Sequence, residues 1–197
     1  MITHKNFILA SSSSSRFKIL KNSGFVFKKT NPECNEEEIK KNFLNRRPAF
    51  IAKKLSFEKA KSVSIKKKYH KDYVIGCDTL IYLNNKIFNK AKNMREAETK
   101  IQKLSGKTHK IISGLTICRE GKMLWQCSST SLVKIRKLTN LEIKKYLYTA
   151  GPQILSSVGC YQIESHGPKI IQDIKGDFFN VMGLPLFSLL KYVFEEK

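Results

Sequence analysis

The sequence predicts an α/β fold. Segments with the residue types of strands alternate along the whole chain with segments that have the 3.6-residue apolar spacing of helices. The chain has 197 residues, 41% of them hydrophobic, so it is long and apolar enough to bury a core. No internal repeat or linker interrupts it. We therefore expect one α/β domain over residues 1–197.

The N-terminal segment predicts a strand, a turn and a helix. Residues 7–10 form a short apolar run, residues 11–15 are all serine, and residues 16–20 have helical spacing before Gly24 interrupts it. Residues 25–27, which are aromatic and β-branched, predict a second strand.

Two helices and a long strand are expected next. The acidic residues 36–38 suit the start of one helix, and Pro48 suits the first turn of another that runs to about Val63. Residues 73–83 are rich in β-branched and aromatic side chains and predict a strand, after which Asn84-Asn85 suits a hairpin turn.

The second half continues the alternation. Helical spacing predicts a helix over residues 94–104 with Gly106 as its stop, and Thr139-x-x-Glu142 has the form of a capping box that opens a short helix. Pro185 opens a C-terminal helix through Phe194. The expected strands of this half are residues 110–118, 123–136, 157–163 and 169–174.

The charge balance is strongly basic. The chain has 37 Lys and Arg against 16 Asp and Glu, a formal net charge of +21, which attracts polyanions. Only six of the 37 are Arg, the side chain best suited to base readout and to clamping phosphates. We interpret the runs Lys53-Lys54 and Lys66-Lys67-Lys68 as solvated faces that steer anions and bind nucleic acid only non-specifically.

Membrane and redox signals are weak. No stretch approaches the roughly 18 apolar residues of a membrane span, so we expect neither a membrane protein nor a secreted precursor. The five cysteines are odd in number and include no C-x-x-C pair. They are interpreted as reduced thiols, and the location as cytoplasmic.

Two charged residues stand where a core would not favour them. Lys59 shares a helical stripe with Leu55 and Val63, so its ammonium either reaches water or points into a cleft at a phosphate or carboxylate. Asp78 lies in the middle of an apolar strand. It either faces water at a sheet edge or adjoins a metal, a cation or a solvent-filled cleft. Gly76, two residues earlier, is consistent with a ligand that approaches the backbone.

The serine turn at residues 11–15 has two interpretations. Its hydroxyls, the helix N–H groups that follow and Arg16 suit a phosphate, although the turn lacks the glycines of a Walker loop. It can equally be a capped loop. His109, in a second polar turn, is interpreted as structural.

Several short motifs occur in collinear order along almost the whole chain. They are Ile8-Leu9-Ala10-Ser11 to Arg16, Glu58-Lys59-Ala60, Gly76-Cys77-Asp78-Thr79, Leu104-Ser105-Gly106 to His109, Gly159-Cys160-Tyr161, and Gly176-Asp177 to Gly183-Leu184-Pro185. Together they resemble the motifs of the Maf family, also called septum formation inhibitor proteins and known as nucleoside triphosphate pyrophosphatases.

The resemblance implies a fold and a reaction. The fold is a two-lobed α/β fold, like that of inosine triphosphatase, around a long mixed β-sheet with a central cleft, commonly in a homodimer. The reaction converts a nucleoside triphosphate, normal or modified, and water to the monophosphate and pyrophosphate with a divalent metal, Mg²⁺ or Mn²⁺.

The resemblance also assigns roles to residues. Asp78 matches the catalytic base that deprotonates or orients water, and Asp78 and Glu36 match metal ligands. The positions that match phosphate contacts are Ser11, Ser13, Arg16, Lys59 and Lys90.

The sequence departs from the family pattern at the positions linked to base specificity. Ser14 replaces the usual Pro, and Ser15 stands where Arg is frequent. Glu164 stands where members that prefer pyrimidines carry Gln, whereas Thr79 stands where a subgroup resembling 7-methyl-GTP enzymes carries Gln. Residues 152–157 supply neither the Glu nor the Lys often found there. Glu164 would accept a hydrogen bond from the donor edge of a purine or modified base.

Two alternatives remain. A pyrophosphatase of the inosine triphosphate type would have a different opening motif. A nucleic-acid-binding or cell-division (septum) regulatory protein would use the basic surface and have an inactive cleft.

Overall fold

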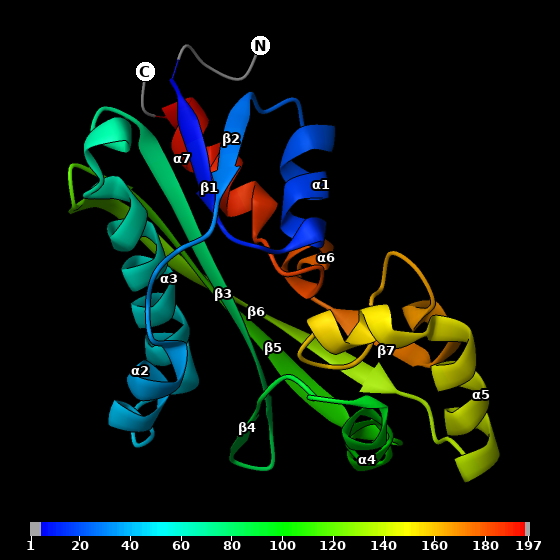
Figure 1. Cartoon of the computed structure of the whole chain (residues 1–197). Helices are drawn as coiled ribbons and strands as arrows, with labels where there is room; N and C mark the ends of the chain where they lie inside the picture. The colour runs from blue at the N-terminus through cyan, green and yellow to red at the C-terminus, as the bar shows by residue number, and fades with distance from the viewer. Residues whose placement is uncertain (1–4, 196–197) are drawn as a thin grey trace. The chain divides into compact units, whose positions relative to one another are not determined.

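The computed structural model describes residues 5–195 and confirms the α/β class (Figure 1). Its seven-stranded sheet has the order β2-β1-β3-β5-β6-β7, with β4 paired to β3. β1 runs parallel to β2 and β3, whereas the β3–β4 and β6–β7 pairs are antiparallel, so the sheet is mixed. The strands are β1 (Phe7–Ala10), β2 (Phe27–Thr30), β3 (Tyr73–Leu83), β4 (Lys86–Phe88), β5 (Thr108–Arg119), β6 (Lys122–Ile135) and β7 (Ile171–Lys175).

Seven α-helices and three short 3₁₀ helices occur within these residues. The α-helices are α1 (Ser14–Asn22), α2 (Glu36–Asn42), α3 (Pro48–Ser64), α4 (Met94–Leu104), α5 (Asn140–Ala150), α6 (Phe178–Val181) and α7 (Leu186–Glu195), and the 3₁₀ helices are η1 (Lys67–Tyr69), η2 (Pro152–Ser156) and η3 (Gly167–Lys169). Across the described residues, no helix combines the length and the apolar character that a membrane span requires.

The contacts divide the chain into two compact units. Unit 1 comprises residues 1–79, 112–129 and 183–197, and unit 2 comprises residues 80–111 and 130–182. A single domain over residues 1–197 stays a prediction.

In unit 1, the first strand and helix form as predicted, and the second strand is displaced. Ser13 is the N-cap of α1, and its side chain accepts a hydrogen bond from the N–H of Arg16. The strand expected at residues 25–27 is wrong, because β2 begins at Phe27. Phe25 instead ends the turn after α1, since its N–H donates to the carbonyl of Leu20.

Helix α3 packs with its backbone unusually close to the sheet. A Cβ atom added to Gly76 of β3 would lie 2.2 Å from the carbonyl oxygen of Ser56, and one added to Gly114 of β5 would lie 2.2 Å from that of Ala52. The prediction that Gly76 admits a ligand is therefore wrong. The backbone that approaches Gly76 is that of α3.

Gly76→Ala is expected to destabilise the protein by at least about 3 kcal/mol, because neither the strand nor the helix backbone can move to admit a methyl group. Chemical denaturation measures the change. Gly106→Ala is the control: Gly106 has a φ of +69°, but the Cβ atom of Lys137 would lie 3.9 Å from the added Cβ, which is an ordinary contact. It should cost only about 1–2 kcal/mol. An equal loss in the two variants would contradict the close-packing argument.

In unit 2, the α4 helix, the Asn84-Asn85 turn and the capping box of α5 are confirmed. The strand expected at residues 157–163 is wrong. Cys160 has a φ of +55°, and the hydroxyl of Ser157 donates to the carbonyl of Tyr161, so this segment turns back on itself. The strand predicted at residues 169–174 is present as β7, which begins two residues later, at Ile171.

His109 of β5 is buried in unit 2 beside Tyr161. The ring Nε2 lies 2.5 Å from the Tyr161 hydroxyl, and Nδ1 is buried without a hydrogen-bond partner in the described part of the chain. Burial lowers the pKa of His109 to about 4. The structure therefore supports a structural, neutral His109.

The titration of His109 should make the protein less stable in acid. Since the folded pKa of about 4 lies below the ordinary value of 6.5, stability present above pH 6.5 is lost as the pH falls toward 4. The loss amounts to about 3 kcal/mol at most. In urea unfolding, His109→Phe should lack this acid-dependent loss of stability. His70→Gln, which changes an exposed histidine, is the control and should keep the loss. Parallel pH curves for the native chain and His109→Phe would contradict the prediction.

Candidate active site

Two carboxylates and one ammonium group meet in unit 1. The Nζ atom of Lys59 lies 2.5 Å from Oδ1 of Asp78 and 2.9 Å from Oε1 of Glu36. The side chains of Lys59 and Asp78 are both 7% exposed, whereas that of Glu36 is 42% exposed. The predicted residues Glu36, Lys59 and Asp78 are thus brought together.

The close packing of α3 on β3 creates this meeting. Asp78 is two residues beyond Gly76 and therefore lies on the same face of the strand, toward α3. Lys59 precedes Ala60, whose nitrogen would lie 2.7 Å from a Cβ at Gly76. The interpretation of Asp78 as a water-facing residue is wrong. So is that of Lys59 as a residue whose ammonium reaches water, because it binds two carboxylates.

The electrostatics favour the charged form of Lys59. Burial on its own lowers the pKa of Lys59, but the charges of Asp78 and Glu36 and the hydrogen bond to Asp78 outweigh it, so the pKa is raised above its usual value. The second carboxylate oxygen of Asp78, Oδ2, is buried and has no hydrogen-bond partner within residues 5–195. A buried acceptor of this kind is costly unless another group satisfies it.

The serine turn lies beside this group. β1 ends at Ala10, which pairs with Gly76, so the chain leaves the sheet next to the residues of β3 that precede Thr79. The hydroxyl of Ser11 is buried and accepts from the N–H of Ser13 and from Nη1 of Arg16. The turn is therefore capped as the second interpretation predicts, with Ser15 in the first turn of α1.

Arg16 links three separate segments of unit 1. Its Nε donates to the carbonyl of Gly183 at 2.8 Å, and its Nη2 donates to the hydroxyl of Thr79 at 3.0 Å. The Thr79 hydroxyl also lies 2.9 Å from that of Ser113. Three of the five N–H donors of Arg16 are thus engaged by the protein itself. Thr79, predicted as a specificity residue, is one of its partners.

The remaining predicted residues, Lys90 and Glu164, belong to unit 2. Lys90 is exposed between β4 and α4, and Glu164 is exposed in the turn before η3. The sequence reasoning missed Lys100, a buried lysine of α4 in the same unit. Its signal was available, because Lys100 shares a helical stripe with Ala97, Ile101 and Leu104, as Lys59 does with its apolar neighbours.

The carboxylates of Asp78 and Glu36 fit a hard divalent cation. Mg²⁺ is commonly held by one or two carboxylates together with the phosphates of a substrate, and Asp78 offers an unpartnered oxygen. In the part of the chain that the structure describes, no three His, Cys, Asp or Glu residues form a group that could hold a metal alone. The donor set therefore suits a metal that arrives with phosphate ligands.

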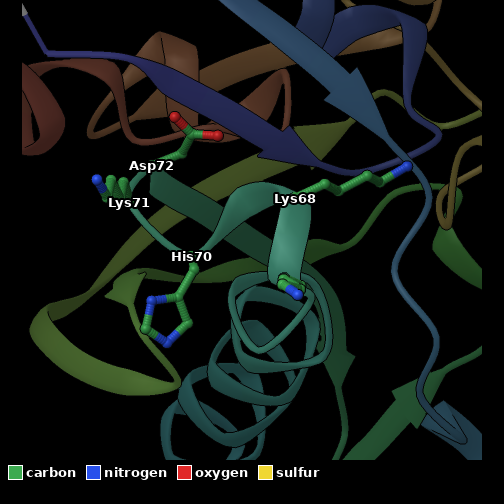
Figure 2. Close-up of a pocket in the computed structure, with 5 residues that line it drawn as sticks. Lys68, His70, Lys71 and Asp72 are labelled. Atoms are coloured by element: carbon green, nitrogen blue, oxygen red, sulfur yellow. The ribbon is translucent and has the colours of Figure 1, made fainter.

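The basic run at η1 forms a separate open pocket in unit 1. It is lined by Lys67, Lys68, His70, Lys71 and Asp72. Figure 2 shows that the side chains of Lys68, His70 and Lys71 spread apart rather than converge on one point. Lys67 and Lys68 are exposed, in agreement with the solvated face predicted from the sequence.

Known proteins with similar sequences share one family. The model of the Maf family, described as "Maf-like protein", matches residues 6–196. A nucleoside triphosphate pyrophosphatase of Caulobacter vibrioides is 35% identical over 187 residues, which cover 94% of this chain and 92% of the relative. A 7-methyl-GTP pyrophosphatase of Bartonella quintana is 38% identical over 183 residues, 93% of this chain and 91% of the relative.

A third relative extends the match slightly. The 7-methyl-GTP pyrophosphatase of Brucella abortus is 35% identical over 192 residues, 96% of each chain. The match of the family model, over residues 6–196, covers the segments that hold Ser11, Lys59, Asp78 and the C-terminal Gly183. The chain belongs to the Maf family.

Proposed function

We propose that the protein is a nucleoside triphosphate pyrophosphatase, which hydrolyses normal or modified nucleoside triphosphates to the monophosphate and pyrophosphate. The family match over residues 6–196 and the relatives named for this reaction support the proposal. The observation that carries it is the buried Asp78, held by Lys59 at one oxygen while the other has no partner among the described residues.

In the proposed mechanism, Oδ2 of Asp78 accepts a proton from the attacking water. The water attacks a phosphorus of the triphosphate, the anhydride bond to the departing pyrophosphate breaks, and the leaving oxygen keeps the electron pair. Lys59 binds Oδ1 of Asp78 and so holds the carboxylate in place, while Oδ2 keeps no partner among the described residues.

The charge of the triphosphate requires several donors. This role falls to the ammonium groups of Lys59 and Lys90, the hydroxyls of Ser11 and Ser13, and the guanidinium of Arg16. Arg16 and Ser13 contribute as parts of the capped turn, so their positions are set before the substrate binds.

Asp78 and Glu36 would hold Mg²⁺ or Mn²⁺. When bound, the cation supplies positive charge that offsets charge developing on the phosphate oxygens. Glu36 can turn from Lys59 toward such a ligand because its side chain is 42% exposed and begins helix α2.

The nucleobase of the substrate would be selected by Ser15, Thr79 and Glu164. Glu164 is a hydrogen-bond acceptor, which suits the donor edge of a purine or a modified base. If so, Glu164→Gln weakens binding of guanine-type nucleotides and leaves pyrimidine nucleotides unaffected. Tighter binding of pyrimidine nucleotides by the native chain, with no effect of Glu164→Gln, would contradict this assignment.

Three further expectations accompany the proposal. A homodimer would sediment at twice the mass of the 22.7 kDa chain. A cytoplasmic location agrees with the five free cysteines of the described chain. Nucleic acid would bind through exposed lysines without sequence preference, and its affinity would fall steeply with salt.

The test is release of pyrophosphate from a panel of normal and modified nucleoside triphosphates. The reaction is run with Mg²⁺, with Mn²⁺ and with a chelator. We expect release from at least one triphosphate, dependent on the cation, with the monophosphate as the second product. Release of single phosphates, or of nothing from any nucleotide, would overturn the proposal.

A further inference from the structure

Lys100 connects two separate segments of unit 2. It lies on α4 and is 9% exposed. Its ammonium donates one hydrogen bond to the carbonyl of Asn89 and another, 3.1 Å long, to the carbonyl of Val158. Asn89 immediately precedes Lys90, and Val158 begins the turned segment that leads to Glu164.

The ammonium of Lys100 is held by main-chain carbonyls rather than by a carboxylate. In the described chain Lys100 forms no ion pair, and burial is the main cause that lowers its pKa. A buried cation needs its donors satisfied, so the two carbonyls are fixed around it. The arrangement uses a lysine to set main-chain positions.

The segment around Val158 has other anchors besides Lys100. The Tyr146 hydroxyl donates to the carbonyl of Cys160 at 3.1 Å, the Ser157 hydroxyl donates to that of Tyr161 at 2.7 Å, and His109 contacts the Tyr161 hydroxyl. Loss of Lys100 would therefore leave this segment in place.

The segment that carries Lys90 is held on both sides. On its C-terminal side, the N–H of Ala91 hydrogen-bonds to the Cys160 thiol, and the N–H of Lys92 donates to Glu96 at 2.9 Å. On its N-terminal side, Phe88 pairs with Ile81 of β3, and the carbonyl of Asn89 receives its bond from Lys100. Lys100 thus adds a side-chain link from α4 to the main chain between β4 and Lys90.

We propose that Lys100 is a positioning residue, which ties the Asn89–Lys90 main chain to the segment at Val158 and so places the Lys90 ammonium for the triphosphate. This inference rests on the proposed function for its ligand, but the two hydrogen bonds of Lys100 to the carbonyls of Asn89 and Val158 do not depend on that function. Lys100 touches no phosphate. It acts through Lys90.

The first measurement is amide hydrogen exchange of the full chain, native and Lys100→Met. Met keeps most of the apolar stem of the side chain and removes its donors. We expect faster exchange in the segment 89–92, with little change in the anchored segment 157–161. The control is Lys103→Met, which removes an exposed lysine one turn along the same helix. Unchanged exchange in Lys100→Met, or equal changes in both variants, would overturn the tie.

The second measurement is the dissociation constant of the α,β-imido analogues of GTP and UTP, taken by calorimetry for the native chain, Lys90→Met, Lys100→Met and the double variant. We expect Lys100→Met to weaken binding by about 10- to 100-fold, because a misplaced contact group loses most of its effect. Lys90→Met should then add little in the Lys100→Met background. Fully additive effects would overturn the positioning role.

The two measurements separate the possible failures. If Lys100 holds the segment but neither analogue binds the native chain, amide exchange in residues 89–92 becomes faster in Lys100→Met while calorimetry detects no heat of binding. That outcome overturns both the triphosphate function and the role of Lys100 in it, and leaves only the tie. If the analogues bind and exchange is unchanged, the proposed function stands and the inference about Lys100 is wrong.

Discussion

Asp78→Asn should lower the rate of pyrophosphate release by about 100- to 10,000-fold, the usual contribution of a general base. An amide cannot take the proton from water, although it has the size of the carboxylate and can still accept the hydrogen bond from Lys59. The loss should appear in kcat for every nucleotide that the native chain hydrolyses, because the proton transfer from water does not depend on which nucleobase the substrate carries. Steady-state kinetics at saturating Mg²⁺ measures it.

Asp72→Asn is the matched control. Asp72 precedes the same strand, β3, and its side chain lines the open basic pocket rather than the Lys59 group. Its activity should equal that of the native chain. If Asp78→Asn retains full kcat while its far-UV spectrum and melting temperature match those of the native chain, Asp78 is not the base.

The sequence predicted elements whose signals are local. The apolar run of β1, the β-branched run of β3, the spacing of α4 and the capping box of α5 each depend on residues within a few positions of one another. The structure confirms all four. β2 and the segment 157–163 were misplaced because distant partners decide them. β2 starts where Phe27 pairs with Phe7, and Cys160 turns the chain against the strand pattern.

The candidate site shows the same division. Sequence pattern alone marked Lys59 and Asp78 as charges on apolar faces, which is a local signal. It could not show that they pair with each other, because the contact depends on how closely α3 approaches β3 at Gly76. Nor could it show that the Arg16 side chain holds Thr79 and Gly183, residues 63 and 167 positions away.

Lys59→Met should cost both stability and activity. It leaves the Asp78 carboxylate buried without its cation, and removal of one partner of a buried ion pair costs about 3–5 kcal/mol. Urea unfolding measures this loss. The rate of pyrophosphate release should also fall, because the ammonium group no longer holds Oδ1 of Asp78 or contacts the triphosphate. Lys54→Met, which breaks the partly exposed pair with Glu58 on the same helix, should cost at most about 1 kcal/mol.

The double variant Lys59→Met with Asp78→Asn separates stability from chemistry. The penalty in Lys59→Met comes from a buried charge without a partner, so neutralising Asp78 should restore part of the lost stability. The second substitution therefore stabilises the protein while activity stays at or below the level of Asp78→Asn. Additive losses of stability would mean that the two side chains do not interact in solution as they do in the structure. A stable double variant that still hydrolyses triphosphates would instead exclude this pair from catalysis.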